Sequence, residues 1–175
     1  MRNQFPVRET IFGLEDSIVS TLGVVVGIAA GTDSRYIVLL SAIVVVVVES
    51  LSMGAGTYLS NKSQMEIERA QGKSGFLRDR KIVAKSVTDS VFMAVSYILG
   101  GLTSVLPFFF LSPRDAIIPS VLISVLTLFY VGFAKGKMAR INPFKSGLEM
   151  STISLTAAGL GFVVGKLASV YLMKP

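Results

Sequence analysis

Long apolar runs alternate with short polar segments along the chain, and five of these runs are long enough to cross a membrane. A hydrocarbon core of about 30 Å needs about 20 helical residues, and the five runs cover residues 11–32, 36–60, 87–112, 116–134 and 146–172. The ten-residue alternation of apolar and polar positions that is typical of membrane β-strands is absent. The pattern therefore predicts an all-α membrane protein with a single domain of five transmembrane helices.

Two details of the apolar runs bear on the helical interpretation. Residues 44–48 are five consecutive valines, typical of a buried strand, but they lie inside a far longer apolar stretch that favours a helix. Pro107 lacks a backbone donor and would free the carbonyl of Thr103, which predicts a kink in the third span.

The longest polar connection is residues 61–85, in which Glu66 and Glu68 are expected to pair with Lys62 and Arg69 on an exposed helix.

The composition removes several classes of protein. The chain is 51% apolar and 16% charged, with a mean hydropathy of +0.66, whereas soluble domains are about 25% charged. It has no Cys and no His, which excludes disulfide scaffolds, thiol or imidazole catalysis and zinc sites of the Cys/His type. Because no nucleophile–base pair or phosphate loop appears either, we expect no enzyme activity and no resident cofactor.

The net charge is +6, and most lysines and arginines fall in segments that would lie on the same side of the membrane. Thirteen of the 17 lie in the N-terminal tail, the second connection and the fourth connection: Arg2, Arg8, Lys62, Arg69, Lys73, Arg78, Arg80, Lys81, Lys85, Lys135, Lys137, Arg140 and Lys145. The positive-inside rule then places the N-terminus in the cytoplasm and the C-terminus outside. The charge is explained by topology, so the expected partner is the lipid bilayer and not a nucleic acid.

Four carboxylates are placed where charge is costly. Glu9 precedes the first span, Asp16 lies about a turn inside it, Glu49 lies deep in the second span, and Glu149 is in the first turn of the fifth. An acidic residue at a helix centre costs about 2.5–3.5 kcal/mol and much less near the ends. Intramembrane acids are functional candidates by default, although pairing with Lys135 or Lys166 is an alternative.

The first span carries its acids and glycines on one stripe. Glu9, Asp16 and Gly23 are seven residues apart, and Gly27 and Gly31 continue the stripe as two overlapping GxxxG units. Such small residues permit close approach of another helix. We expect a homodimer packed through this helix; the alternative is packing against the second or fifth span of the same chain.

The second span brings a carboxylate and a thioether onto one surface. Glu49 and Met53 are four residues apart. The first span enters from the cytoplasm and the second returns to it, so Asp16 and Met53 lie at similar depth, and Glu149 begins the fifth span from that same side. Carboxylates alone suit Mg²⁺, Ca²⁺ or Mn²⁺, whereas an added thioether favours softer ions. Ordinary packing is the alternative for any single methionine.

These residues resemble the vacuolar iron transporter family. Residues 8–13 with Asp16, and residues 52–63 with the run Ser-Met-Gly-Ala-Gly-Thr-Tyr-Leu, carry the resemblance, and nearly the whole chain is covered. Later landmarks agree: residues 99–101, 106–107 and 132–136, and Ser146 with Glu149. The resemblance implies a dimer of five-helix subunits that exchanges protons for divalent iron, or manganese and related ions, and moves the metal out of the cytosol.

The same resemblance assigns roles and shows departures. It implies that Glu9, Asp16 and Met53 bind metal, and it matches Glu149 and Lys135 to an acid of the fifth helix and a lysine of the fourth. These two residues and Glu15 are our candidates for metal entrance or proton coupling. The helix-two carboxylate expected two turns before the methionine is Val45 here, and Glu49, one turn closer, is its candidate substitute. The long acidic cytoplasmic domain of many family members is replaced by the short, net basic connection 61–85.

The sequence therefore predicts an exporter of Fe²⁺ or Mn²⁺ that works by proton antiport, in the cell membrane of a prokaryote or a vacuolar-type membrane of a eukaryote. One alternative is a non-transporting membrane subunit whose intramembrane acids form structural ion pairs. Another is an exporter of organic cations, which would need an aromatic-lined cavity. The absence of Trp and the grouping of Phe108, Phe109 and Phe110 near one helix end favour an interfacial position for these rings instead.

Overall fold

The computed structural model describes residues 6–72 and 76–172 and confirms the five predicted helices. They are α1 (Val7–Gly31), α2 (Arg35–Ala70), α3 (Phe76–Val105), α4 (Pro113–Met138) and α5 (Pro143–Leu172), with a short 3₁₀ helix, η1 (Leu106–Phe109), after α3. Each of the five is long and apolar enough to cross a membrane. Two of the basic residues used above to predict the orientation, Arg2 and Lys73, lie outside the described residues.

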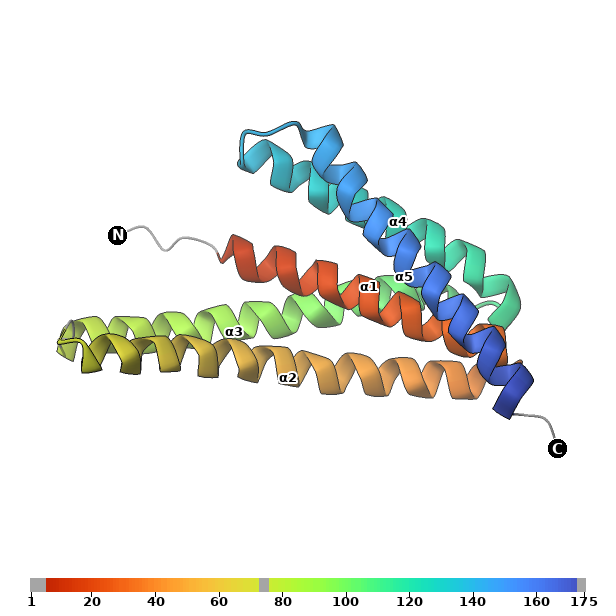
Figure 1. Cartoon of the computed structure of the whole chain (residues 1–175), viewed down its shortest axis with the longest axis horizontal. Coiled ribbons are helices and arrows are strands. Elements are labelled where there is room, and N and C mark those ends of the chain that lie inside the picture. Colours follow the sequence, from red (N-terminus) through yellow and green to blue (C-terminus); the bar gives the residue numbers. More distant parts are fainter. Residues whose placement is uncertain (1–5, 73–75, 173–175) are drawn as a thin grey trace.

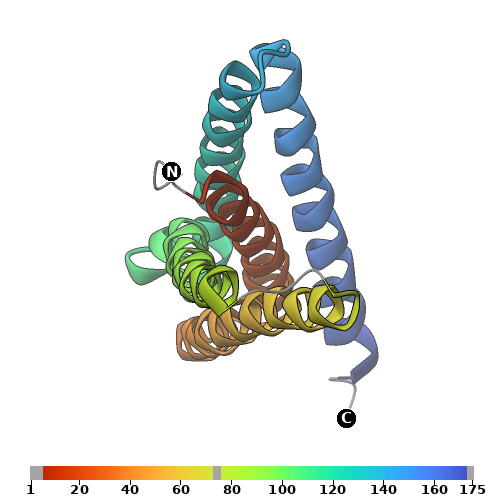
Figure 2. The same cartoon turned by 90° about the vertical axis from the view of Figure 1, so that its left-hand side faces the viewer.

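The helices form two antiparallel pairs with α1 between them. α2 packs along α3, and α4 packs along α5, while α1 contacts α3 and α5 far more extensively than it contacts α2. The two pairs converge at the end that holds the C-terminus and diverge at the end that holds the start of α1 and the α2–α3 and α4–α5 connections (Figures 1 and 2). The described basic residues of the α1 start, the α2–α3 connection and the α4–α5 connection therefore lie at one end, as the positive-inside reasoning requires.

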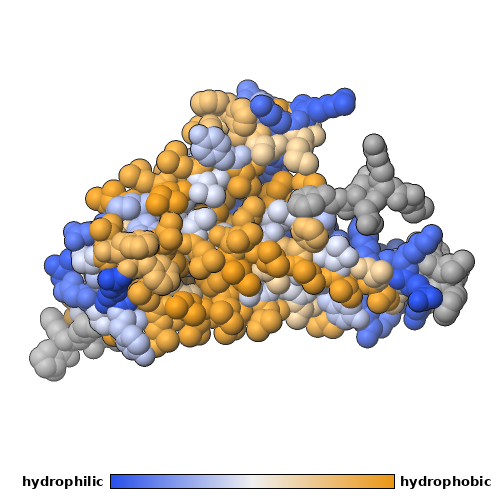
Figure 3. Space-filling model, turned by 180° about the vertical axis from the view of Figure 1, so that it is seen from behind, coloured by the Kyte–Doolittle hydropathy of each residue, from blue (hydrophilic) through white to orange (hydrophobic). Residues whose placement is uncertain are grey.

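The helices are longer than the spans read from hydropathy. α2 continues ten residues beyond its predicted span to Ala70, and the connection 61–85 is largely helical. Lys62 pairs with Glu66 one turn later, with 3.9 Å between Nζ and Oε1, as expected for an exposed helix. The face of the molecule in Figure 3 has a broad hydrophobic band between hydrophilic ends, which suits a protein surrounded by lipid.

The valine run is helical, whereas Pro107 does not produce the predicted kink within a continuous helix. α3 ends at Val105, and Pro107 lies at the start of η1, where its missing donor costs no α-helical bond. The three phenylalanines that follow are not uniformly interfacial. Phe108 is fully buried with Val25, Val38 and other core residues, whereas Phe110 is 77% exposed.

Glycines let α1 approach its neighbours closely. A Cβ on Gly13 would lie 2.8 Å from the carbonyl oxygen of Met93, and a Cβ on Gly100 would lie 2.9 Å from that of Leu14. Both distances are shorter than side chains tolerate, so these glycines permit the α1–α3 contact. This contact fixes the depth at which the polar side chains of α3 face α1.

Candidate functional site

Four polar side chains from three helices meet inside the membrane-spanning part of the bundle. We call Asp16 and Ser20 of α1, Glu49 of α2 and Tyr97 of α3 the Tyr97 cluster. The Tyr97 hydroxyl donates to Oε2 of Glu49 and lies 2.7 Å from Oγ of Ser20. Asp16 and Glu49 lie within electrostatic range of each other, and Tyr97 lies within range of both. The structure thus brings together the two intramembrane acids that the sequence singled out.

Tyr97 connects α1 to α2. Its side chain is fully buried, and its backbone carbonyl accepts a hydrogen bond from the Ser17 hydroxyl. α1 and α2 contact each other little, whereas α3 packs extensively against both. Burying a tyrosine ring is favourable, and its hydroxyl needs a hydrogen-bond partner when it is buried. Glu49 and Ser20 supply those partners.

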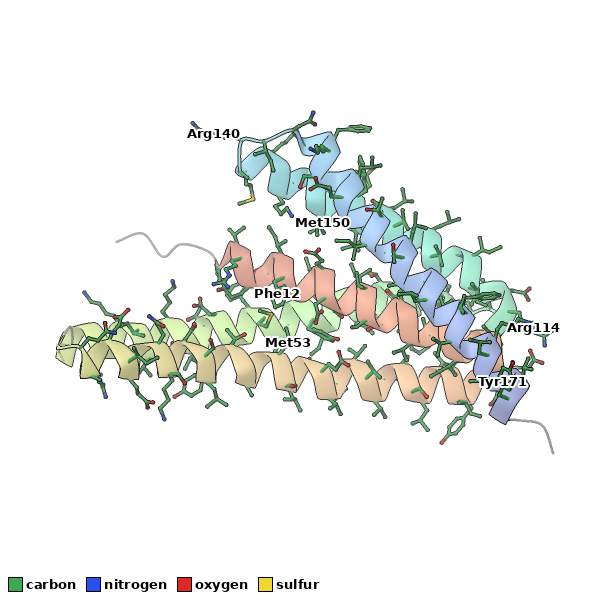
Figure 4. All side chains as sticks on the ribbon, in the orientation of Figure 1. Phe12, Met53, Arg114, Arg140, Met150 and Tyr171 are labelled. Carbon is green, nitrogen blue, oxygen red and sulfur yellow. The ribbon has the colours of Figure 1, made fainter. Side chains whose placement is uncertain are left out.

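A cavity of about 410 Å³ opens beside the cluster, toward the end with the basic connections, and we call it the mouth pocket. Its lining includes Glu9 of α1, Met53 and Asn61 of α2, and Met93 of α3. Figure 4 shows Met53 close to Phe12, which also lines this pocket, in the N-terminal half of α1. Two thioethers, a carboxylate and an amide oxygen are therefore available to an ion in one cavity.

A further carboxylate lies behind the mouth pocket. Asp89 of α3 is only 5% exposed and accepts a hydrogen bond of 3.3 Å from the Asn61 amide. It lies within electrostatic range of Glu9 and of Lys85. Within the described part of the chain no three acidic side chains form a metal-binding group by themselves, so an ion here would need the mixed oxygen and sulfur ligands of the pocket.

The ligand candidates follow one another in depth. On α2, Met53 lies one turn, about 6 Å, nearer the basic end than Glu49, and on α1, Glu9 lies about 10 Å nearer that end than Asp16. On α3, Asp89 is two turns from Tyr97. The polar groups thus continue from the mouth pocket to the Tyr97 cluster, alongside the same three helices.

Two other predicted residues line a separate cavity. Glu15 of α1 and Lys135 of α4 line a pocket of about 540 Å³ between these helices, together with Arg8 and Phe12. Because Arg8 and Phe12 also line the mouth pocket, the two cavities lie on neighbouring sides of α1. Glu149 is exposed on α5 and lines neither of these two cavities.

The glycine stripe of α1 packs inside the chain. Gly23, Gly27 and Gly31 face α5, where a Cβ on Gly27 would lie 2.9 Å from the carbonyl oxygen of Gly161 and one on Gly31 would lie 3.1 Å from that of Gly165. The intramolecular alternative considered for this stripe is thus what the structure contains. A groove of about 750 Å³ remains open along the same α1–α5 contact.

Tyr97, Asp89 and Met93 were not among the residues that the sequence reasoning selected. They are four residues apart on α3, so they share one face, and all three are buried. That spacing of an acid, a thioether and a phenol within an apolar segment is the signal that could have found them. A tyrosine lowers hydropathy little, and Asp89 lies only two residues inside the predicted third span, so neither residue is conspicuous.

Five membrane-length helices that enclose carboxylates and thioethers define a multi-pass integral membrane protein with an ionisable interior. Comparison with known proteins agrees with this class. The model of the VIT family matches residues 7–75 and 73–166. The chain belongs to this family.

Similar proteins come from archaea, plants and yeast. An uncharacterized protein of Methanocaldococcus jannaschii, MJ0645, is 28% identical over 91% of this chain and 88% of its own length. Vacuolar iron transporter 1 of Eucalyptus grandis is 26% identical over 91% of this chain and 85% of its own. Protein CCC1 of Saccharomyces cerevisiae is 21% identical over 92% of this chain and 68% of its own.

Proposed function

We propose that this protein transports divalent transition-metal ions, Fe²⁺ or Mn²⁺, out of the cytosol in exchange for protons. The observation that carries the proposal is the meeting of Asp16 and Glu49 within the membrane-spanning bundle, beside a pocket that holds Glu9 and Met53. Burying an ionisable group at this depth in the membrane costs free energy, so such a group indicates a functional site. Family membership and relatives named vacuolar iron transporters support the same function.

The chemistry of the ligands supports exchange with protons. A carboxylate binds metal only when it is ionised, so protonation of Asp16 or Glu49 from the far side would release the ion. Metal that arrives through the mouth pocket would in turn displace those protons. The thioethers of Met53 and Met93 favour transition ions over Mg²⁺ and Ca²⁺.

The alternative of a non-transporting subunit with structural ion pairs has less support. Among the described residues neither Asp16 nor Glu49 forms an ion pair with Lys or Arg. Two nearby acids with no cation between them suit a place that a metal ion or protons occupy.

Metal uptake into proteoliposomes under an imposed pH gradient tests the proposal. Wild-type protein should take up Fe²⁺ or Mn²⁺ in a gradient-dependent way, and Asp16→Asn should abolish the uptake. Asp33→Asn is the matched control, because it removes an exposed carboxylate that pairs with Arg114 near the C-terminal end of α1. The proposal fails if the wild type shows no gradient-dependent flux, or if Asp16→Asn transports as well as the wild type.

We also propose that the protein forms a homodimer through α1, with a second copy in the open groove along α1 and α5. The groove is almost wholly apolar and is lined by Val24 and by Gly23 and Gly27. Since the chain has no native cysteine, a single Val24→Cys variant should cross-link to a dimer in membranes, whereas Leu122→Cys on the lipid-exposed side of α4 should not. Equal cross-linking of the two variants would reject this interface.

A further inference from the structure

We propose that Tyr97 is a positioning residue for metal binding: with Ser20, it holds the Glu49 carboxylate of α2 against α1, beside Asp16. The inference rests on the proposed transport function, since it concerns how the two acids come to act together. It starts from the hydrogen bonds of the Tyr97 hydroxyl, which join a side chain of α1 to a side chain of α2 through α3.

The number of protons fixes the direction of these bonds. An ionised carboxylate only accepts, and the tyrosine hydroxyl has one proton. Because Tyr97 donates that proton to Glu49, the short contact with Ser20 requires the serine hydroxyl to donate to Tyr97. The other acceptor available to Ser20, the carbonyl oxygen of Ser17, is farther away at 3.4 Å, compared with 2.7 Å for the tyrosine oxygen. The hydrogen bonds therefore run from Ser20 as donor to Tyr97, and from Tyr97 as donor to Glu49.

These hydrogen bonds position Glu49 because helix packing alone does little to do so. A glutamate side chain has three rotatable bonds, and ordering it costs conformational entropy. α1 and α2 pack little against each other, so direct helix contact gives Glu49 little restraint toward α1. Tyr97, in contrast, is restrained: it is fully buried, and its backbone is held at α1 by the Ser17 hydroxyl and by the close approach at Gly100 and Gly101.

The hydrogen bond also makes the two oxygens of the Glu49 carboxylate different. Oε2 accepts a hydrogen bond from the Tyr97 hydroxyl, so we expect an ion to bind mainly through Oε1, together with Asp16. A carboxylate oriented in this way binds without first losing rotational freedom. Tyr97 acts through Glu49 in this arrangement and need not touch the ion.

Tyr97→Phe tests the inference because it removes the hydroxyl and keeps the buried ring. We expect the apparent KM for Mn²⁺ in proteoliposomes, and the Kd from calorimetry on the purified protein, to rise about tenfold, the scale of one hydrogen bond to a charged group. The maximal rate should change much less. Tyr130→Phe is the matched control, because Tyr130 is 69% exposed on α4 and its variant should behave as the wild type.

A second variant separates positioning from general loosening of the bundle. Ser20→Ala should raise the KM about two- to threefold, and it should have no further effect in the Tyr97→Phe background, because Ser20 acts only through the tyrosine. Independent, additive effects of the two substitutions would overturn the inference. A wild-type KM and Kd for Tyr97→Phe in a transporter that is otherwise active would overturn it as well, while leaving the transport proposal intact. A wild type that neither binds nor transports Mn²⁺ or Fe²⁺ would overturn both.

Discussion

Two glycines of α5 that are only two residues apart should respond in opposite ways to the same substitution. Gly161 packs against α1, where an added Cβ would collide with the backbone at Gly23. A Cβ on Gly159 would meet none of the described atoms within 4 Å. Gly161→Ala should therefore destabilise the protein, and Gly159→Ala should leave it unchanged or slightly more stable.

The difference between the two variants isolates the cost of separating the helices. Replacing Gly by Ala in a helix interior gains about 0.5–1 kcal/mol of backbone stability, and this gain is similar in both variants. Forcing a methyl group into a well-packed contact costs about 1–3 kcal/mol. We therefore expect Gly161→Ala to be about 1–3 kcal/mol less stable than Gly159→Ala. At roughly 2–4 °C per kcal/mol for a chain of this size, the separation in Tm should be several degrees.

Thermal unfolding in detergent, followed by loss of the monodisperse peak in size-exclusion chromatography, provides the measurement. It should be made at protein concentrations where the oligomeric state of both variants is the same, because association shifts Tm. Equal Tm values for the two variants would show that α1 and α5 do not pack through these glycines. The internal assignment of the glycine stripe would then be wrong, and the stripe would be free for a partner.

Three further predictions concern the site, the orientation and the surface. Met53→Leu keeps the volume but removes the thioether, so preference for Fe²⁺ over Mg²⁺ in competition uptake should fall about tenfold; unchanged selectivity would exclude a ligand role. A membrane-impermeant maleimide should label Tyr36→Cys in intact cells but Ser63→Cys only after permeabilisation, and the reverse pattern would invert the topology. Arg114→Ala breaks the ion pair with Asp33, whose two side chains are 77% and 71% exposed. The free energy of unfolding, measured by thermal unfolding, should therefore change by less than about 1 kcal/mol. A larger loss would mean that Arg114 has a structural role beyond this pair.

The number and approximate position of the helices could be predicted because lipid enforces them. Each span must be about 20 residues long and apolar, whatever its local propensity, and so five valines are helical at residues 44–48. The helix ends beyond the membrane escape this constraint, and hydropathy therefore missed the extension of α2 to Ala70. The effect of Pro107 depends on where α3 meets η1, which hydropathy does not encode.

The candidate site could be predicted only in part. Asp16 and Glu49 stand out because charge within an apolar run is costly. The order of helices around α1 is set by the packing of many side chains, and it places α3 between these two acids. Tyr97 becomes significant only in that arrangement, since a single tyrosine in an apolar helix is otherwise ordinary. Glu149 shows the converse: it lies in the second turn of α5 and not in the first as predicted, and α4 and α5 diverge from α2 and α3 at that end (Figure 1).

The composition of the α1 stripe now has a structural explanation. In its C-terminal half the stripe consists of Gly23, Gly27 and Gly31 and packs against α5, where a Cβ on Gly27 or Gly31 would lie 2.9 or 3.1 Å from a backbone carbonyl oxygen. Toward the start of α1 the two helix pairs diverge (Figure 2), and the same stripe carries Asp16 and Glu9. One face of a single helix therefore packs against the α5 backbone at one end and carries carboxylates at the other. In the proposed transport, an ion in the mouth pocket would find carboxylates along this face as far as Asp16, and beyond Asp16 the face packs against α5.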